Sequence, residues 1–246
     1  MRQVIIYLVM GFFSLFILGF GIWTYSQSLY SEKIKKSFIE KEISNIKDLN
    51  NISLLSNKNV LLTGQIQASS TFNSRDNQKV VLERYKEEKE TAKGWQEIKD
   101  NSFFKVIPFK LNSSNQTIIV DPYGLDKAYI GVPKSKIEIV DGIKIKKNLW
   151  ILKEGQKVNI LGNIENKSGV LVVNNPNLYK SFFDSLFNKE PFIITSMEKG
   201  ETANKANEIG KSIYYSSFAL FAVGIFFIFN SIINVLKHYK NIQNNF

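Results

Sequence analysis

The sequence predicts a membrane protein in which two transmembrane helices flank an antiparallel β-barrel or sandwich-like domain, a β-rich α+β architecture. Two uncharged apolar runs, residues 4–25 and 212–236, predict the helices. Between these runs, stretches of alternating apolar and polar residues are separated by Gly, Asn, Asp and Pro, a pattern typical of half-buried strands joined by turns. The β-domain is therefore expected over residues 58–200.

The first apolar run predicts a membrane anchor. At about 1.5 Å per residue, the 22 residues from 4 to 25 make a helix of roughly 33 Å, enough to cross a hydrocarbon core of ~30 Å. A cleaved signal peptide is the alternative reading of an apolar N-terminus. Its apolar core would span only about 7–15 residues, so the length of the run favours an uncleaved anchor.

The second apolar run, residues 212–236, is uncharged and ends at Lys237. Tyr214 and Tyr215 stand at its start, as aromatic residues do at membrane interfaces. Asn230 and Asn234 are four residues apart and so share one helix face. Their amides predict hydrogen bonds to the first helix or self-association with another copy. The alternative is that both lie at the interface and bind water.

Basic residues near both termini predict the orientation. Arg2 precedes the first run, and Lys237, His238 and Lys240 follow the second. The positive-inside rule then places both tails in the cytoplasm, with the β-domain on the outer side. Lys, Asn, Ile and Phe are abundant together, as in proteins of A/T-rich genomes. This composition indicates a bacterial source, and hence the bacterial plasma membrane.

Residues 29–56 predict a juxtamembrane amphipathic helix, because apolar residues recur every three to five positions from Ile34 to Leu49. Its apolar stripe is expected to pack on the β-domain or to lie on the membrane surface. Turns are expected at residues 121–124, 141–142 and 166–169. The segment EKGETANKANEIG predicts a helix leading into the second span. The expected strands lie in NVLLTGQIQAS, KVVLERYKEEKE, GWQEIKDNSFFKVIPFKL, QTIIV, SKIEIV, IKIKKNLWIL, QKVNILGNI, VLVV and PFIITSM.

The net charge of +10 comes mainly from lysine. Nucleic-acid readers favour arginine, and this chain has only Arg2, Arg75 and Arg84. Attraction to anionic lipid headgroups suits a lysine-rich domain at least as well, so no nucleic-acid partner is expected. The run from residue 83 to 90 predicts a solvated strand edge. An ordinary lysine-rich β-surface is expected at Lys134, Lys136, Lys144, Lys146, Lys147, Trp150, Lys153 and Lys157.

Catalytic and metal-binding residue types are scarce. The chain has no cysteine, and its one histidine, His238, follows the second span. Neither a Ser–His relay nor a Cys- or His-based zinc site is therefore expected in the β-domain. No phosphate-binding glycine loop occurs, and turn-building explains Asp121 and Asp141. We predict no catalytic, cofactor-binding or metal-binding residues, although the sequence leaves a carboxylate-only hydrolase open.

The order of several segments resembles the membrane domain of the mulan-type mitochondrial E3 ubiquitin ligases, the GIDE domain, which also occurs in bacterial proteins. The segments are LLTGQIQAS, VVLERYKEEKE followed by Trp95, VIPFKL, VDPYG, LKEGQKVNILGNI, LVVNNP and PFIITS. Those ligases carry a RING with Cys and His zinc ligands after the second span. This chain has no Cys, so it is identified as a bacterial-type member lacking the RING. The resemblance implies turn or core roles for Gly64, Trp95, Pro108, Phe109, Gly155, Gly162 and Phe192.

These patterns together predict an interaction or scaffold protein at the membrane surface. Its expected partners are the lipid bilayer and either another protein or a second copy held through Asn230 and Asn234. The alternative is a membrane-bound enzyme, either ubiquitin-ligase-like, as the resemblance suggests, or an unrecognised hydrolase. The missing Cys and His residues favour the non-enzymatic function.

Overall fold

A computed structural model describes residues 2–41, 43–44, 59–113, 116–177, 184 and 188–243. The chain divides into two compact units. The helical unit comprises Met1–Lys35, Ser181–Lys189 and Asn204–Phe246. The β-unit comprises Lys36–Lys180 and Glu190–Ala203, so it includes the last turn of one long helix and the first turn of the other.

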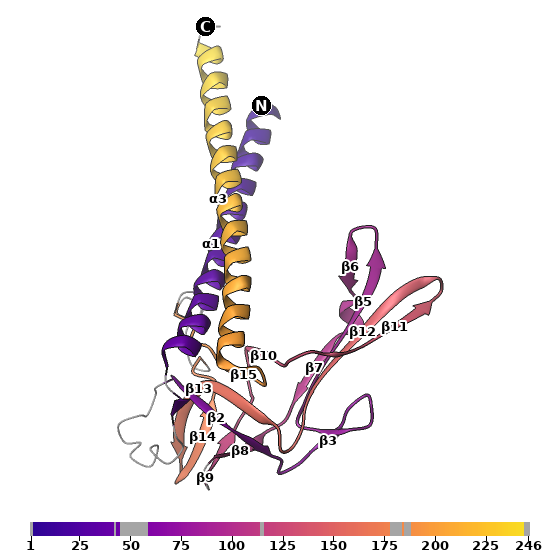
Figure 1. The fold of residues 1–246 in the computed structure, drawn as a ribbon. Helices are drawn as coiled ribbons and strands as arrows, with labels where there is room; N and C mark the ends of the chain where they lie inside the picture. Colours follow the sequence, from indigo (N-terminus) through magenta and orange to yellow (C-terminus); the bar gives the residue numbers. More distant parts are fainter. Residues whose placement is uncertain are drawn as a thin grey trace. The chain divides into compact units, whose positions relative to one another are not determined.

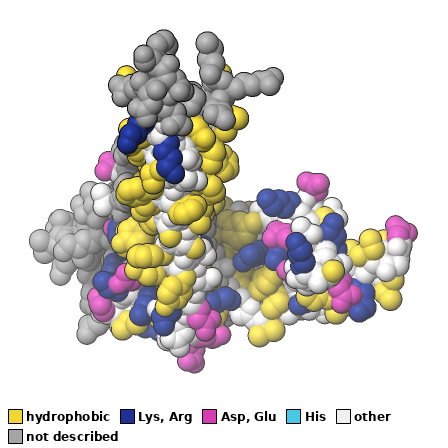
Figure 2. Space-filling model, turned by 90° about the horizontal axis from the view of Figure 1, so that it is seen from above, with side chains coloured by type: hydrophobic (Ala, Val, Ile, Leu, Met, Phe, Trp, Pro, Cys, Tyr) yellow, Lys and Arg dark blue, Asp and Glu magenta, His cyan; other side chains and the backbone are white. Residues whose placement is uncertain are grey.

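Two long helices, α1 (Arg2–Glu40) and α3 (Lys199–Gln243), supply the helical unit (Figure 1). Both are long and apolar enough to cross a membrane, judged by length and composition. Small residues line their contact: a Cβ on Gly224 would lie 2.8 Å from Leu18 Cδ2, and one on Gly21 would lie 3.2 Å from Phe221. Figure 2 shows hydrophobic side chains gathered over the helices.

Helix α1 corrects the expected division near residue 29. One continuous helix spans residues 4–25 and continues to Glu40, and Ile43–Ser44 then forms strand β1. The predicted helix from 29 to 56 is therefore wrong at Ile43–Ser44, and its residues 45–56 lie outside the described part. The reason is tertiary: Ile43 and Ser44 pair in parallel with Leu61 and Leu62.

A closed five-stranded barrel forms the centre of the β-unit. Its order is β2 (Asn59–Gln67), β8 (Phe109–Ser113), β9 (Gln116–Val120), β14 (Val170–Asn174) and β13 (Lys157–Lys167), which pairs back with β2. This is the strand order of the OB-fold, a Greek-key barrel. The expected barrel is present and most of its strand pairs are antiparallel, but β9 and β14 run parallel. The long connection between these two strands permits that crossover.

Two further short strands extend the sheet beyond the barrel. Strand β15 (Ile193–Thr195) pairs antiparallel with β13, and β10 (Lys127–Tyr129) pairs parallel with β15. Strand β15 confirms the expected strand in PFIITSM. The expected helix after it is also confirmed, because α3 begins at Lys199 and runs on without a break.

Aliphatic and aromatic side chains fill the barrel. Phe109, Phe192, Leu62, Ile160 and Val173 are all buried there. The alternation expected along β13 fails in its middle, where Leu161 and Asn163 are buried as well. Leu161 pairs with Leu61 on one side and Ile193 on the other, so apolar side chains of both neighbouring strands flank it on its own face of the sheet.

A second sheet, called here the arm, projects from the barrel (Figure 1). It consists of β11 (Lys134–Val140), β12 (Ile143–Leu152), β5 (Leu82–Thr91), β6 (Gly94–Glu97) and β7 (Phe103–Val106). Strands β5–β7 lie in the connection between β2 and β8. Strands β11 and β12 lie in the connection between β9 and β13. Leu82 and Leu152 are buried in the barrel core, so β5 starts from it and β12 ends in it.

Strand β5 corrects the prediction of a solvated edge at residues 83–90. It is an interior strand, with β12 on one side and β6 and β7 on the other. Several of its charged residues therefore form ion pairs with residues of the neighbouring strands. Lys144 Nζ lies 3.0 Å from Glu90 Oε2, and Lys86 Nζ lies 3.6 Å from Glu97 Oε2.

Short hairpins complete the β-unit. Strands β3 (Phe72–Asn73) and β4 (Lys79–Val80) form one, and the 3-10 helix η2 (Lys99–Asn101) separates β6 from β7. The expected turn at 141–142 is confirmed, with positive φ at both Asp141 and Gly142, as a two-residue hairpin turn requires.

Candidate binding groove

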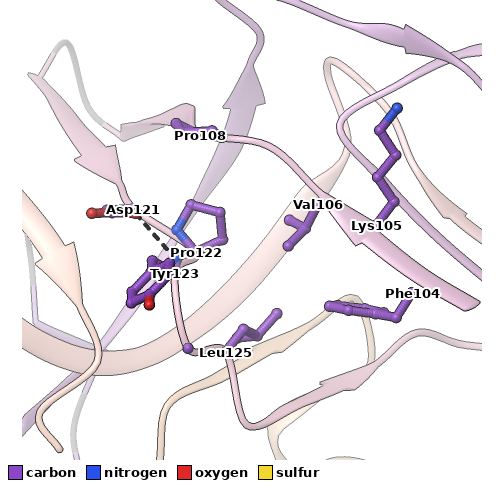
Figure 3. A pocket seen from close by; sticks show the side chains of 9 residues that line it. Phe104, Lys105, Val106, Pro108, Asp121, Pro122, Tyr123 and Leu125 are labelled. Carbon is purple, nitrogen blue, oxygen red and sulfur yellow. Dashed lines mark hydrogen bonds between the residues drawn. The ribbon is translucent and has the colours of Figure 1, made fainter. Parts of the chain in front are cut away.

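A groove of about 530 Å³ lies at the root of the arm, and we treat it as the candidate site (Figure 3). One wall is formed by residues 104–106 of β7 and by Pro108, and the other by residues 121–125, which follow β9. In the first segment the connection between β2 and β8 returns to the barrel, and in the second the connection between β9 and β13 leaves it. The groove is therefore a product of the tertiary arrangement of two insertions.

The first wall presents the edge of β7. Side chains of successive strand residues point to opposite faces of a sheet. Three successive residues, Phe104, Lys105 and Val106, nevertheless line the groove. The groove must then run along the strand's edge and not over one face. Among the described strands β7 pairs only with β5, so no described strand pairs with its second edge.

Hydrogen bonds fix the second wall. Asp121 N donates to Val173 O at 2.9 Å, and Leu125 N donates to Pro122 O at 3.0 Å. Asp121 Oδ1 accepts a hydrogen bond from Tyr123 N at 3.1 Å, the contact drawn in Figure 3. This side-chain-to-backbone bond is the usual role of Asp in a turn.

The backbone conformation at Gly124 in this wall favours glycine. Its φ is +70°, and a Cβ there would lie 2.6 Å from Asn175 Nδ2. Asn175 Nδ2 also donates to Gly124 O at 2.5 Å. The turn expected at residues 121–124 is thus confirmed, and it is held rigidly against the barrel.

The groove is mainly apolar and aromatic. Tyr123 is 72% exposed and Phe104 is 44% exposed, although both are large rings. The Lys105 ammonium lies 4.2 Å from the centre of the Phe72 ring, a cation–π contact. The nine lining residues include one carboxylate, Asp121, and no Ser, Thr or His. This arrangement provides apolar contacts and a strand edge.

The sequence located part of this groove. Pro108 lines it, whereas Phe109 and Phe192 are buried in the core, as expected. Trp95 does not have the expected turn or core role. It is 38% exposed on the arm, and Lys146 Nζ lies 5.8 Å from its ring centre. The sequence pattern did not single out Phe104 or Tyr123. Two features of the sequence could have indicated them. Phe104 belongs to a Phe–Phe pair, and strand alternation places the two rings on opposite faces. Tyr123 is an aromatic residue inside a predicted turn.

The basic residues do not form one continuous surface. The strand registers place Lys144 and Lys146 on one face of the arm, and Lys134, Lys136 and Lys147 on the other. Several lysines already have acidic partners: Lys134 lies 2.6 Å from Asp76, and Lys147 lies 2.5 Å from Glu138. On the arm, the lysine-rich β-surface is thus divided between two faces, and several of its lysines are paired with carboxylates.

Two further sequence expectations concern metals and the asparagine pair. In the part of the chain that the structure describes, no group of three or more His, Asp or Glu side chains is placed to hold a metal ion. Asn234 Nδ2 donates to Asn230 Oδ1 at 3.1 Å. The two amides therefore do share one face of α3, and self-association through them stays a prediction.

The fold and the groove define a class: a chain with two helices long and apolar enough to cross a membrane, joined to an OB-type barrel unit with a groove at the root of its arm. Comparisons of the chain with protein-family models, with curated proteins and with solved structures found no match.

Proposed function

We propose that this protein is a membrane-anchored interaction module whose groove binds an extended segment of a partner protein. The observation that carries this proposal is the open edge of β7 beside exposed Phe104 and Tyr123. OB-type barrels serve many functions, so the argument rests on the groove and not on the fold.

The groove suits strand addition. An incoming extended segment forms main-chain hydrogen bonds with a free strand edge, and pockets for alternate side chains supply specificity. Here Phe104, Val106 and Leu125 offer apolar contacts, and Tyr123 adds a phenol hydroxyl. A segment that presents an apolar or aromatic side chain toward these residues fits this chemistry best.

Membrane anchoring explains the surface of the helices. Only 12% of the apolar window of α1 and 11% of that of α3 is buried within the structure, unlike the core helices of soluble proteins. Contact with lipid gives these side chains an apolar environment. We propose the N-in/C-in orientation in a bacterial plasma membrane, with the β-unit on the outer side, because both tails are basic.

We further propose that the module is of the GIDE type and lacks its ubiquitin chemistry. RING zinc ligands include cysteines, and this chain has none. A membrane-bound hydrolase is disfavoured at the groove, because Asp121 has no second carboxylate, Ser or His among the lining residues.

Site-specific photocrosslinking in living cells tests the proposal. A benzophenone amino acid is placed at Tyr123 in the groove, or at Val132, which is 96% exposed and does not line the groove. We expect one defined partner peptide to crosslink at 123 but not at 132. Equal labelling at the two positions would show that the groove has no special role.

Binding of the identified peptide to the full-length protein in nanodiscs is the quantitative test. Removing one large buried ring contact costs about 1.5–3 kcal/mol, so Phe104→Ala and Tyr123→Ala should each weaken binding at least about tenfold. Val132→Ala is the matched control and should leave binding unchanged. Unaltered affinity in both groove variants would overturn the proposal.

A further inference from the structure

Strand β11 is the outermost strand of the arm. It pairs with β12 along one edge, and no described strand pairs with its other edge. Three of its seven residues are charged, but two large apolar side chains are exposed on it: Ile137 is 56% exposed and Ile139 is 72% exposed. A seven-residue edge strand of this kind is a template for pairing with another chain.

The side chains of β11 divide between two faces of the arm. Ser135, Ile137 and Ile139 lie on one face, and Lys134, Lys136, Glu138 and Val140 lie on the other. The charged residues restrict which strand can pair with this edge and in which register. Like charges directly opposite each other are destabilising, and opposite charges are stabilising.

We propose that β11 pairs antiparallel with β11 of a second copy of this chain, in the register centred on Ile137. In this register Ile137 stands opposite the second copy's Ile137, and Lys136 stands opposite the second copy's Glu138. By symmetry the Lys–Glu pair occurs twice. Ser135 then faces Ile139, and Lys134 faces Val140, so all seven residues of the strand are paired.

The neighbouring symmetric registers are worse. A two-fold axis perpendicular to the joined sheet allows only registers in which a residue faces its own copy. Centring on Lys136 sets two ammonium groups opposite each other, and centring on Glu138 sets two carboxylates opposite each other. Either shift also leaves only five of the seven residues paired. The charge pattern therefore selects Ile137 as the centre.

The monomer already prepares this charge arrangement. Lys136 Nζ lies 2.9 Å from Glu138 Oε1, and Lys147 Nζ lies 2.5 Å from Glu138 Oε2. Glu138 thus carries the negative charge between Lys136 and Lys147 on this face of the arm. Pairing also brings two copies of Ile137 and Ile139 together on one face, which covers apolar surface that each copy alone exposes.

Single cysteines test the register, because the chain has no native cysteine. Directly opposite Cα atoms in an antiparallel pair are about 4.5–5.5 Å apart, within the range of a disulfide. Ile137→Cys in full-length protein, oxidised mildly in native membranes, should therefore form a covalent dimer. Ser135→Cys alone should not, because the two copies of residue 135 are four positions apart, or about 13 Å.

A mixture of chains sharpens the test. Ser135→Cys chains combined with Ile139→Cys chains should crosslink to each other, since these positions are opposite in the proposed register. Equal dimer yields from Ile137→Cys alone and Ser135→Cys alone would indicate random collision and overturn the register. Absence of crosslinking in every combination would overturn the pairing itself.

A disrupting variant keeps the outcome independent of cysteine chemistry. Ile137→Lys places two ammonium groups at the two-fold axis and should reduce the dimer fraction in light scattering from detergent micelles. Val170→Lys changes another exposed aliphatic residue, on β14, and is the control. The crosslink at position 137 should persist in an Asn230→Leu, Asn234→Leu background, which separates this pairing from association through the helix amides. It should also persist in Tyr123→Ala, which separates this pairing from binding in the groove.

Discussion

At the scale of single residues, close approach decides where glycine is needed. A Cβ on Gly64 would lie 2.6 Å from Asn112 O, and one on Gly162 would lie 2.8 Å from Val173 Cγ1 and 2.9 Å from Phe192 Cδ2. Both glycines stand at strand positions where the alternating pattern calls for an apolar side chain. At Gly64 the neighbouring strand leaves no space for a methyl group, and at Gly162 a neighbouring strand and the Phe192 ring leave none.

Gly162→Ala should therefore destabilise the β-unit by about 1–3 kcal/mol, because the added methyl group overpacks the core. Gly131→Ala is the matched control in the same unit, since a Cβ there meets nothing within 4 Å. Its effect should stay within about 0.5 kcal/mol. Urea unfolding of the full chain in detergent, followed by circular dichroism, measures both. Equal midpoints for the two variants would show that the core adapts at Gly162.

At the scale of elements, the arm is stabilised by cross-strand charges as well as by its apolar base. Hydrogen bonds from Lys147 and Lys136 lower the pKa of Glu138 to about 2, and a hydrogen bond from Lys86 lowers the pKa of Glu88. On the same face as Glu138, burial and the hydrogen bond to Glu87 raise the pKa of Tyr85 to about 12. The arm therefore keeps its charge pattern at neutral pH.

Acid should loosen the arm. The folded-state pKa of Glu138, about 2, lies below its ordinary value of 4.5. The stabilisation is thus fully present above pH 4.5 and is lost as the pH falls toward 2. Trp95 and Trp150 report on the arm, and Trp23→Phe removes the remaining tryptophan. Their fluorescence should change across this window in the Trp23→Phe protein.

Glu138→Gln should flatten that acid transition, because the substituted amide does not titrate. Glu154→Gln, outside the arm's ion pairs, is the control and should leave the transition in place. A transition that is the same in the parent and in Glu138→Gln would assign the acid sensitivity to other carboxylates, such as Asp76, whose pKa is lowered by a hydrogen bond from Lys134.

At the scale of the whole molecule, the two helices determine where the β-unit can act. Both helices expose large apolar side chains, for example Phe12 and Phe226. If both cross one membrane, the two termini lie on the same side and the β-unit lies on the other. The groove and β11 are then available to partners on one side only.

Thiol labelling in intact cells tests this orientation. Val132→Cys, in the β-unit, should react with a membrane-impermeant maleimide in intact cells. Lys240→Cys, beyond the apolar run of α3, should react only after permeabilisation. The cysteine-free parent is the blank. Labelling of both positions from the same side of an intact membrane would contradict the helical hairpin.

Most individual elements could be predicted from the sequence. Alternation in NVLLTGQIQ and the turn at 141–142 depend on neighbouring residues, so they are readable locally. Ile43–Ser44 was misassigned because its partner is Leu61–Leu62, about eighteen residues away. Residues 83–90 were predicted to form a solvated edge because the segment is rich in charged residues. Those charges are balanced by residues of β6 and β12, and the sequence alone does not show that these strands lie beside β5.

The sequence by itself determined the apolar lengths of the two helices, the β character of the segment between them, and the lack of cysteine and of histidine other than His238. These are properties of composition and short-range periodicity. Only the tertiary structure decided that five strands close into a barrel, that two insertions join as one arm, and that β7 and residues 121–125 enclose a groove. The physical reason is that strand pairing and cavities depend on contacts between residues far apart in the chain, and such contacts leave little trace in local pattern.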